Sequence, residues 1–394
     1  MAMPDDTKGL AMRVFQPEVA ADLQSFPCES FWELPLYIPG YRGCMAKDLE
    51  GFSQALLCWF GENARDLPWR REYSAYSVWV AETMLCQTQV ERVIPYYLRW
   101  MERFPELPCV AVAPLEEVLL LWEGLGYYRR AVKLHEASQR VFQEFGGEIP
   151  RDYHALCALP GIGPYIAGAV LSIAYDEPYP AVDANVRRVV ERFLGPEKTP
   201  RSRKTVEDFL VPFLLRASPR LFNQALMDLG ALVCTPRKPQ CGCCPLASWC
   251  GVGEGKAPEL LRKKPQRVPL HIVVVAFVRG KEVLVRKRQN TRLFTGLFEL
   301  PWEESDAPSE DLVVSLAHVF SLTTKSVENL GSFRHAYSRY AVWATLFLAR
   351  VEGIPSGSAL FLDFDRLSRY PFPSLHRKAI ALLAPFMEKG LFVP

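Results

Sequence analysis

The stretch Leu159–Val170 (LPGIGPYIAGAV) joins two segments of helical character. The residues just before it, RDYHALCAL, favour a helix, and Pro164 suits the first turn of a following helix, where its missing N–H costs nothing. Gly161 and Gly163 allow a tight turn that leaves backbone N–H groups exposed at the positive end of the second helix. We therefore expect a hairpin of two helices whose turn binds a phosphate group.

A Gly-x-Gly turn alone is a weak signal, because most such turns bind nothing. Between two helices and after LPG, it is typical of a helix-hairpin-helix DNA-binding element, which we expect over residues 151–175. The net charge of +2 adds no sign of a nucleic-acid partner. Pairs of basic residues such as Arg187-Arg188 and Arg237-Lys238 suit phosphate contacts, although any single pair is more often a solvated helix face.

The length of 394 residues predicts two or three domains, and a content of 49% hydrophobic and 23% charged residues is ordinary for a globular protein. The apolar run Ile272–Val278 has the length of a strand rather than of a membrane span. The first residues, MAMPDDTKGLAMRVF, lack the apolar core of a secretion signal. We therefore expect no membrane association and a cytoplasmic, nucleoid-associated protein.

The hydrophobic pattern divides the chain into four parts. Residues 1–44 lack a helical period and are expected to be an extension, whereas residues 45–255 read almost entirely as helices. Residues 256–269 are basic and rich in proline, as in a linker. In residues 270–394 a hairpin pattern (HIVVVAFV, then KEVLVRKR) alternates with helix-like stretches. The predicted fold class is an all-α domain followed by a mixed α+β domain.

Five cysteines occur within the seventeen residues 234–250 (CTPRKPQCGCCPLASWC). In a reducing compartment, clustered cysteines bind metal more often than they form disulfides. The four thiolates of Cys234, Cys241, Cys244 and Cys250 suffice for one tetrahedral zinc ion or one iron–sulfur cluster, and spacing alone does not choose between them. Cys243 is a spare thiol.

Glu82 lies in a helical pattern with apolar or nearly apolar neighbours three and four residues away on both sides. Poor solvation of the ionised form raises a carboxyl pKa, and a carboxyl protonated near neutral pH is what a general acid requires. A buried glutamate paired with an arginine fits the pattern equally well. Asp183 precedes another helical run, and its residues alone favour a simple helix N-cap.

Together these stretches resemble the adenine DNA glycosylases of the MutY family, within the endonuclease III superfamily. The resemblance covers about Leu67 to Cys250 and extends more weakly to the C-terminus. Its motifs, in chain order, are LPWR, VWVAETMLCQTQV, WEGLGYYRRAVKLH, LPGIGPYIAGAVLS, AVDANVRRV and FNQALMDLGALVCTPRKPQC. The order of several motifs is far more specific than any one of them.

The resemblance implies a [4Fe–4S] cluster on Cys234, Cys241, Cys244 and Cys250. It implies a monomer that acts on double-stranded DNA and excises adenine opposite 8-oxoguanine or guanine. Glu82 would protonate the adenine, Asp183 would stabilise the sugar cation, and Tyr165 and Asn185 would position them. Tyr165 stands where strand-cleaving relatives carry a lysine, so the implied enzyme is monofunctional. Contacts with DNA would come from Gln87, Tyr127, Gly161, Gly163, Arg237 and Lys238.

The C-terminal part resembles the Nudix-like domain that reads 8-oxoguanine in this family. It lacks the acidic helix that holds Mg²⁺ in Nudix hydrolases, so we expect no pyrophosphohydrolase activity. Tyr337, Ser338 and Arg339 stand where the family usually has Phe-Ser-His, and Arg339 puts the strength of lesion preference in doubt. Cys86 and Ala184 are two further departures, and neither removes a catalytic group.

Three alternatives stay open at this point. An endonuclease III-like glycosylase for oxidised pyrimidines is disfavoured by Tyr165 and by the C-terminal domain. A Nudix-type hydrolase is disfavoured by the missing acidic helix. A non-catalytic iron–sulfur DNA-binding protein is disfavoured by the presence of both Glu82 and Asp183.

Overall fold

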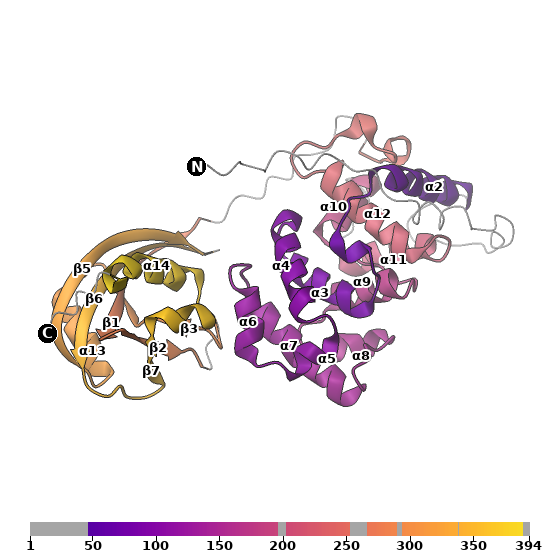
Figure 1. Cartoon of the computed structure of the whole chain (residues 1–394). Coiled ribbons are helices and arrows are strands. Elements are labelled where there is room, and N and C mark those ends of the chain that lie inside the picture. Colours follow the sequence, from indigo (N-terminus) through magenta and orange to yellow (C-terminus); the bar gives the residue numbers. More distant parts are fainter. Residues whose placement is uncertain (1–45, 196–201, 253–265, 290–293, 338, 389–394) are drawn as a thin grey trace, which may run out of the picture. The chain divides into compact units, whose positions relative to one another are not determined.

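A computed structural model describes residues 46–195, 202–252, 266–289, 294–337 and 339–388 (Figure 1). The expected N-terminal extension and most of the expected linker lie outside these residues. The chain forms two compact units, residues 1–86 with 149–262 and residues 87–148 with 263–394. Each unit is therefore built from two separate stretches of the chain, and the domain limits expected from the sequence remain predictions.

The first unit is helical. Its helix α3 (Ala75–Leu85) is buried on nearly every side, and Trp79 within it is 1% exposed. Five helices begin at a residue whose side chain accepts a backbone N–H of the first turn: Ser74, Asp152, Asp183, Ser202 and Ser218. The helical elements are α2 (Ala46–Asn63), η1 (Pro68–Arg70), α3 (Ala75–Leu85), α8 (Tyr153–Ala158), α9 (Pro164–Ala169), η2 (Val170–Ala174), α10 (Ala184–Leu194), α11 (Arg203–Leu214), α12 (Pro219–Leu232), η4 (Cys241–Cys243) and η5 (Ala247–Trp249).

The predicted helical hairpin is confirmed. Helix α8 ends at Ala158 and α9 begins at Pro164, with Pro164 in the first turn. Gly161 has φ +82°, in the left-handed region that favours glycine. Gly163 has φ −101° and is the N-cap of α9, a backbone conformation that other residues also adopt.

The second unit combines a seven-stranded sheet with helices from both of its stretches of chain. Within the described residues these are α4 (Val90–Arg103), α5 (Leu107–Val112), α6 (Leu115–Trp122), α7 (Arg129–Glu144), α13 (Glu310–Val319), η6 (Phe364–Arg369) and α14 (Ser374–Glu388). The sheet has the order β3-β2-β1-β6-β5, with β4 beside β1 and β7 beside β2. Its strands are β1 (Val268–Arg279), β2 (Glu282–Lys287), β3 (Phe298–Glu299), β4 (Trp302–Glu304), β5 (Thr323–Ala336), β6 (Tyr340–Glu352) and β7 (Ala359–Asp363).

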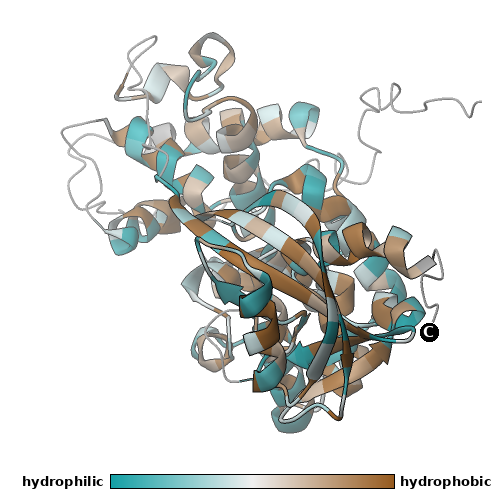
Figure 2. Ribbon diagram, turned by 90° about the vertical axis from the view of Figure 1, so that its left-hand side faces the viewer, coloured by the Kyte–Doolittle hydropathy of each residue, from teal (hydrophilic) through white to brown (hydrophobic). Residues whose placement is uncertain are grey.

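Strand β1 explains why the apolar run in the sequence is continuous. It pairs in parallel with β6 and antiparallel with β2, which confirms the predicted hairpin. Val274 and Ala276 face a core shared with α14 (Ser374–Glu388), whereas Val273 and Val275 face a core shared with α13 (Glu310–Val319). Because both faces are covered, alternation of apolar and polar residues disappears. Figure 2 shows the hydrophobic stretches along these strands.

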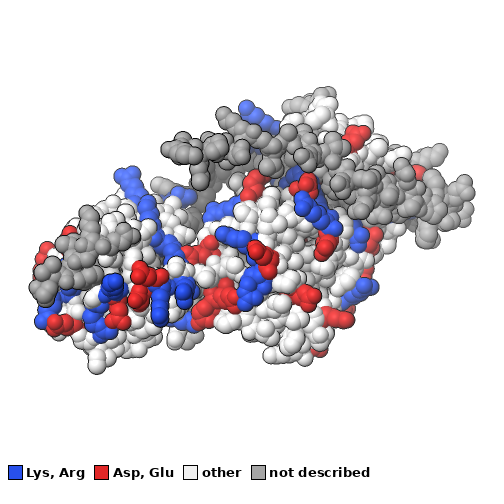
Figure 3. All heavy atoms as spheres, in the orientation of Figure 1, with Lys and Arg blue, Asp and Glu red and all other residues white. Residues whose placement is uncertain are grey.

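The surface carries charge of both signs. Lysine and arginine are interspersed with aspartate and glutamate on the face drawn in Figure 3, as the small net charge leads one to expect. Within the described part of the chain, none of the helices has the length and apolar character needed to cross a membrane.

Candidate active site

Glu82 is buried in the first unit, with 5% exposure, on α3. The Tyr165 hydroxyl, at the start of α9, donates a hydrogen bond to Glu82 Oε2. Burial raises the pKa of Glu82 to about 7, against opposing contributions from that hydrogen bond and from the charges of Arg70 and Arg65. The negative charge of Asp183 adds to the increase. The alternative of a simple Glu–Arg pair does not hold, since no arginine within the described residues forms an ion pair with Glu82.

Asp183 is a helix N-cap that also lies near the other residues predicted as catalytic. It is the N-cap of α10, with Oδ1 accepting the Val186 N–H at 2.7 Å. Its second oxygen accepts a hydrogen bond from Asn185 Nδ2 at 2.9 Å. Burial raises the pKa of Asp183, although the Val186 and Asn185 hydrogen bonds oppose the increase. Tyr165 and Glu82 both lie within electrostatic reach of this carboxyl group, so the four residues predicted as catalytic lie near one another.

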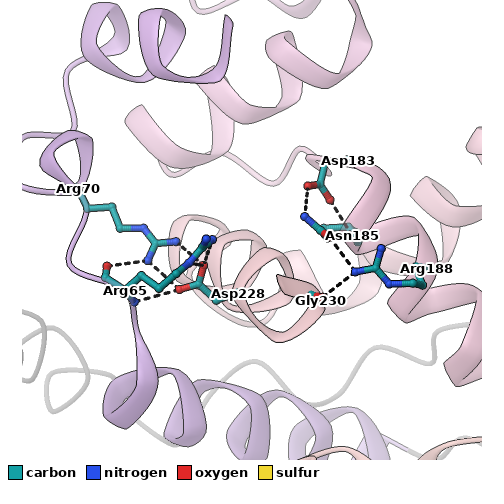
Figure 4. A network of polar contacts seen from close by, with 8 residues as sticks. Arg65, Arg70, Asp183, Asn185, Arg188, Asp228 and Gly230 are labelled. Atoms are coloured by element: carbon teal, nitrogen blue, oxygen red, sulfur yellow. Dashed lines mark hydrogen bonds and ion pairs between the residues drawn. The ribbon is translucent and has the colours of Figure 1, made fainter. Parts of the chain in front are cut away.

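Arg188 extends this network toward the cysteine-rich loop (Figure 4). Its Nη2 donates to Asn185 Oδ1 at 2.8 Å and to the Gly230 carbonyl at 2.6 Å. Its Nε donates to the carbonyl oxygen of Cys234 at 2.8 Å. Asn185 is therefore held from two sides, by Asp183 and by Arg188. The same guanidinium group also binds the start of the cysteine-rich loop, at the Cys234 carbonyl.

Asp228 anchors a second polar cluster that sequence reasoning missed. It lies on α12 with 0% exposure and accepts hydrogen bonds from Arg65 Nε at 2.9 Å and Arg70 Nη1 at 2.8 Å (Figure 4). Burial by itself raises the pKa of Asp228, but the charges and hydrogen bonds of Arg70 and Arg65 outweigh it and hold the pKa below its usual value. A signal was available, since Asp228 interrupts the apolar run of ALMDLGAL.

The four predicted cysteine ligands line a single cavity. Cys234, Cys241, Cys244 and Cys250 share its walls with apolar side chains and with Arg192, whose Nη1 lies 3.5 Å from Cys234 Sγ. Cys243 is exposed and is not part of the lining. The cavity thus brings together four thiol groups, the number of ligands needed for one zinc ion or one iron–sulfur cluster.

The predicted DNA-contacting side chains include two with an unusual backbone. Gln87 has φ +65° and Tyr127 has φ +50°, a region that non-glycine residues occupy at a cost of about 1–3 kcal/mol and that is concentrated at functional sites. Gln87 is exposed, and Tyr127 is 48% exposed. Arg237 and Lys238 are exposed on the cysteine-rich loop. Nothing in the sequence patterns around Gln87 or Tyr127 revealed this conformation.

The predicted lesion-reading residues lie at the turn between β5 and β6. Tyr337 is half-buried, and burial raises its pKa above its ordinary value. Arg339 is exposed, with its guanidinium 5.7 Å from the ring of Tyr340. Ser338 lies outside the described residues.

Two family models match the chain. Residues 80–213 match the HhH-GPD superfamily of base excision DNA repair proteins, and residues 272–382 match the NUDIX domain. The first span contains Glu82, Tyr165 and Asp183, and the second contains the β5–β6 turn. The helical core and the Nudix-like sheet predicted from the sequence are thus confirmed.

Curated relatives match over most of the chain. The adenine DNA glycosylase of Rattus norvegicus is 34% identical over 369 residues, which cover 78% of this chain and 72% of the relative. That of Homo sapiens is 33% identical, covering 78% and 68%. That of Mycolicibacterium smegmatis is 38% identical, covering 66% and 89%. Because these relatives are 33–38% identical and the match covers 68–89% of their length, the chain belongs to the adenine DNA glycosylase family.

Proposed function

We propose that this adenine DNA glycosylase removes adenine from opposite 8-oxoguanine or guanine, with Glu82 as the general acid and without cutting the strand. One observation carries the proposal: Glu82 is a buried carboxyl whose pKa is raised to about 7, hydrogen-bonded to Tyr165 and facing the charge of Asp183. A carboxyl with that pKa holds a proton at neutral pH and still releases it readily.

The proposed reaction breaks one bond and forms one. Glu82 transfers its proton to the adenine ring, the N-glycosidic bond breaks, and the bonding pair leaves with neutral adenine. The Asp183 carboxylate stabilises the positive charge left on the sugar. Water adds to C1′ and returns a proton to Glu82, which leaves an abasic site. Tyr165 has no amine for a Schiff base, so strand cleavage does not follow.

The cluster of Arg65, Arg70 and Asp228 contributes to the electrostatics of the proposed acid. Both guanidinium groups act on Glu82, and Asp228 fixes them by ion pairs at 2.6 and 2.8 Å. We place the extruded adenine within reach of Glu82, where contacts with the protein offset a cost of extrusion on the order of a few kcal/mol.

A [4Fe–4S] cluster on Cys234, Cys241, Cys244 and Cys250 fits the cavity. When bound, it supplies a rigid, redox-active anchor for the loop rather than the hydrolytic chemistry. Arg188 and Arg192 hydrogen-bond the carbonyl oxygen of Cys234, and Arg192 also approaches its sulfur. The loop then presents Arg237 and Lys238 to the DNA backbone.

The remaining predicted residues would make the contacts with DNA. The helical hairpin with Gly161 and Gly163 would bind a phosphate at the N-terminus of α9, and Gln87 and Tyr127 would enter the duplex. Tyr337, Ser338 and Arg339 would read 8-oxoguanine. We propose that the protein acts as a monomer on double-stranded chromosomal DNA.

The decisive test uses duplex DNA that carries adenine opposite 8-oxoguanine, treated with the cluster-loaded protein and analysed with and without hot alkali. We expect breaks only after alkali. Glu82→Gln should lower the excision rate by about 10²–10⁴-fold, the range for loss of a general acid, and retain DNA binding. Glu62→Gln, an exposed glutamate on α2, is the matched control and should excise at the wild-type rate. Breaks without alkali would refute the monofunctional assignment.

A further inference from the structure

Two segments assigned to the lesion side meet through one aromatic residue in the second unit. The turn before α7 carries Tyr127 and Tyr128, and the β5–β6 turn carries Tyr337. The Phe294 ring lies between them, with its centroid 6.1 Å from that of Tyr128 and 5.4 Å from that of Tyr337. These separations are typical of interacting aromatic pairs. Phe294 has no part in the function assigned so far.

The segment from Phe294 to Leu297 is tightly held. Phe294 has φ +62°, a strained conformation for a phenylalanine that persists only where its surroundings fix it. Leu297 N–H donates to the Phe294 carbonyl at 3.1 Å, and Gly296 N–H donates to the Arg288 carbonyl at 2.9 Å. A Cβ added to Gly296 would lie 2.9 Å from Leu119 Cδ1, so the loop packs directly against α6.

The Tyr128 end is held as firmly. Tyr128 is 5% exposed, and its hydroxyl accepts the Gly124 N–H at 3.1 Å and donates to the Phe372 carbonyl at 3.5 Å. Glu123 accepts the Phe372 N–H at 3.1 Å and forms a two-pronged ion pair with Arg377. These contacts bind the turn that carries Tyr127 and Tyr128 to the segment before α14. The exposed Tyr127 side chain is next to Tyr128 in the chain.

We propose that Phe294 is a positioning residue that couples the turn bearing Tyr127 to the β5–β6 turn, so that preference for 8-oxoguanine over guanine depends on it. The inference rests on the proposed lesion recognition. Packed rings have few alternative arrangements, so displacing one turn displaces the other. Holding both turns in place before DNA arrives also lowers the ordering cost of binding.

The test compares single-turnover excision of adenine opposite 8-oxoguanine and opposite guanine, with the cluster-loaded protein. Phe294→Ala should lower the ratio of the two rate constants about tenfold, the size expected when a coupling between contacting residues is lost. The rate opposite guanine should stay within about twofold, because the catalytic groups lie in the other unit. Phe294→Tyr keeps the ring and should keep the ratio.

Phe386→Ala is the matched control. Phe386 is a half-buried phenylalanine of α14 that packs against the core of the same sheet. It should lower the melting temperature about as much as Phe294→Ala and leave the ratio unchanged. Equal loss of the ratio in both variants would mean that general destabilisation causes the effect, which would overturn the inference.

Tyr128→Leu provides an independent check. It should lower the ratio in the wild-type background and add nothing in the Phe294→Ala background, because both changes cut the same connection. Additive losses would refute the coupling. If the wild type prefers 8-oxoguanine and Phe294→Ala retains that preference, this inference alone is refuted. If the wild type shows no preference, the proposed lesion recognition is refuted and this inference with it.

Discussion

Glu82 on α3 and Asp228 on α12 are carboxylates of the same unit with almost equal burial and opposite behaviour. Their exposures are 5% and 0%, yet the pKa of Glu82 is raised to about 7 and that of Asp228 is lowered. Burial acts on both in the same direction. The difference lies in the partners, because Asp228 has two guanidinium groups and Glu82 has a neutral hydroxyl. The fold thus keeps one carboxyl as an acid and fixes the other as an ion.

Breaking the Asp228 side of this comparison should have the largest effect. Asp228→Asn leaves two partly or fully buried guanidinium groups without a counter-ion, and removal of one partner of a buried pair costs about 3–5 kcal/mol. Urea unfolding at pH 7 would measure the loss. Asp208→Asn, which removes an exposed partner of Lys204, is the control and should be silent. A loss below about 1 kcal/mol would show that water reaches the cluster.

Removing the Glu82 charge should increase the free energy of unfolding, whereas removing the Asp228 charge decreases it. The folded pKa of about 7 exceeds the ordinary value of 4.5, so the stability contributed by protonated Glu82 is complete below pH 4.5 and is lost as the pH rises through 7. Glu82→Gln should therefore be more stable than the wild type by about 3 kcal/mol at pH 8 and equal to it near pH 4. Chemical unfolding at the two pH values tests this. A difference in stability between Glu82→Gln and the wild type that is the same at both pH values would show that the Glu82 charge does not cause it.

Excision itself should report the same pKa. Only protonated Glu82 donates to adenine, so the single-turnover rate should fall about tenfold per pH unit above pH 7, which corresponds to about 1.4 kcal/mol per unit. The rate profile should be measured with DNA saturating at every pH, so that binding does not contribute. A fall centred near pH 4.5 would place Glu82 in an aqueous environment and contradict its burial.

A half-exposed carboxylate completes the series with the smallest effect. Glu116 on α6 forms an ion pair with Lys287, and the hydrogen bond from Lys287 lowers the pKa of Glu116. Because its side chain remains 38% exposed, Glu116→Gln should cost no more than about 1 kcal/mol. Thermal unfolding in low and high salt would measure it, and the difference should shrink in high salt. Salt-independent loss would indicate a packing role instead.

The sequence predicted what depends on short spacings. The apolar neighbours of Glu82 lie within four residues, so its burial and the direction of its pKa shift followed from helical geometry. The hairpin before Pro164 and the strands around Arg279-Gly280 are local in the same way. Asp228 had a similar apolar setting, but Arg65 and Arg70 lie 163 and 158 residues away, and no spacing rule connects them.

The second unit shows the same limit more strongly. Contacts such as Glu123 with Arg377 and Tyr128 with Phe372 join residues 254 and 244 positions apart. Composition placed α4–α7 with the other helices, whereas packing places them with the sheet. The backbone at Gln87 and Tyr127 was equally out of reach, since a left-handed non-glycine residue is fixed by its tertiary surroundings rather than by its own preference.

The division of each unit into two stretches of chain also sets an order of events during synthesis. Residues 87–148 leave the ribosome well before residues 263–388, with which they pack. At a rate of synthesis of about 5–20 residues per second, Gly296 is made on the order of ten seconds or longer after α6. Until then, Leu119 of α6 lacks its contact with the segment at Gly296. For that interval the nascent chain carries an uncovered apolar surface, which is a binding site for chaperones that recognise such surfaces.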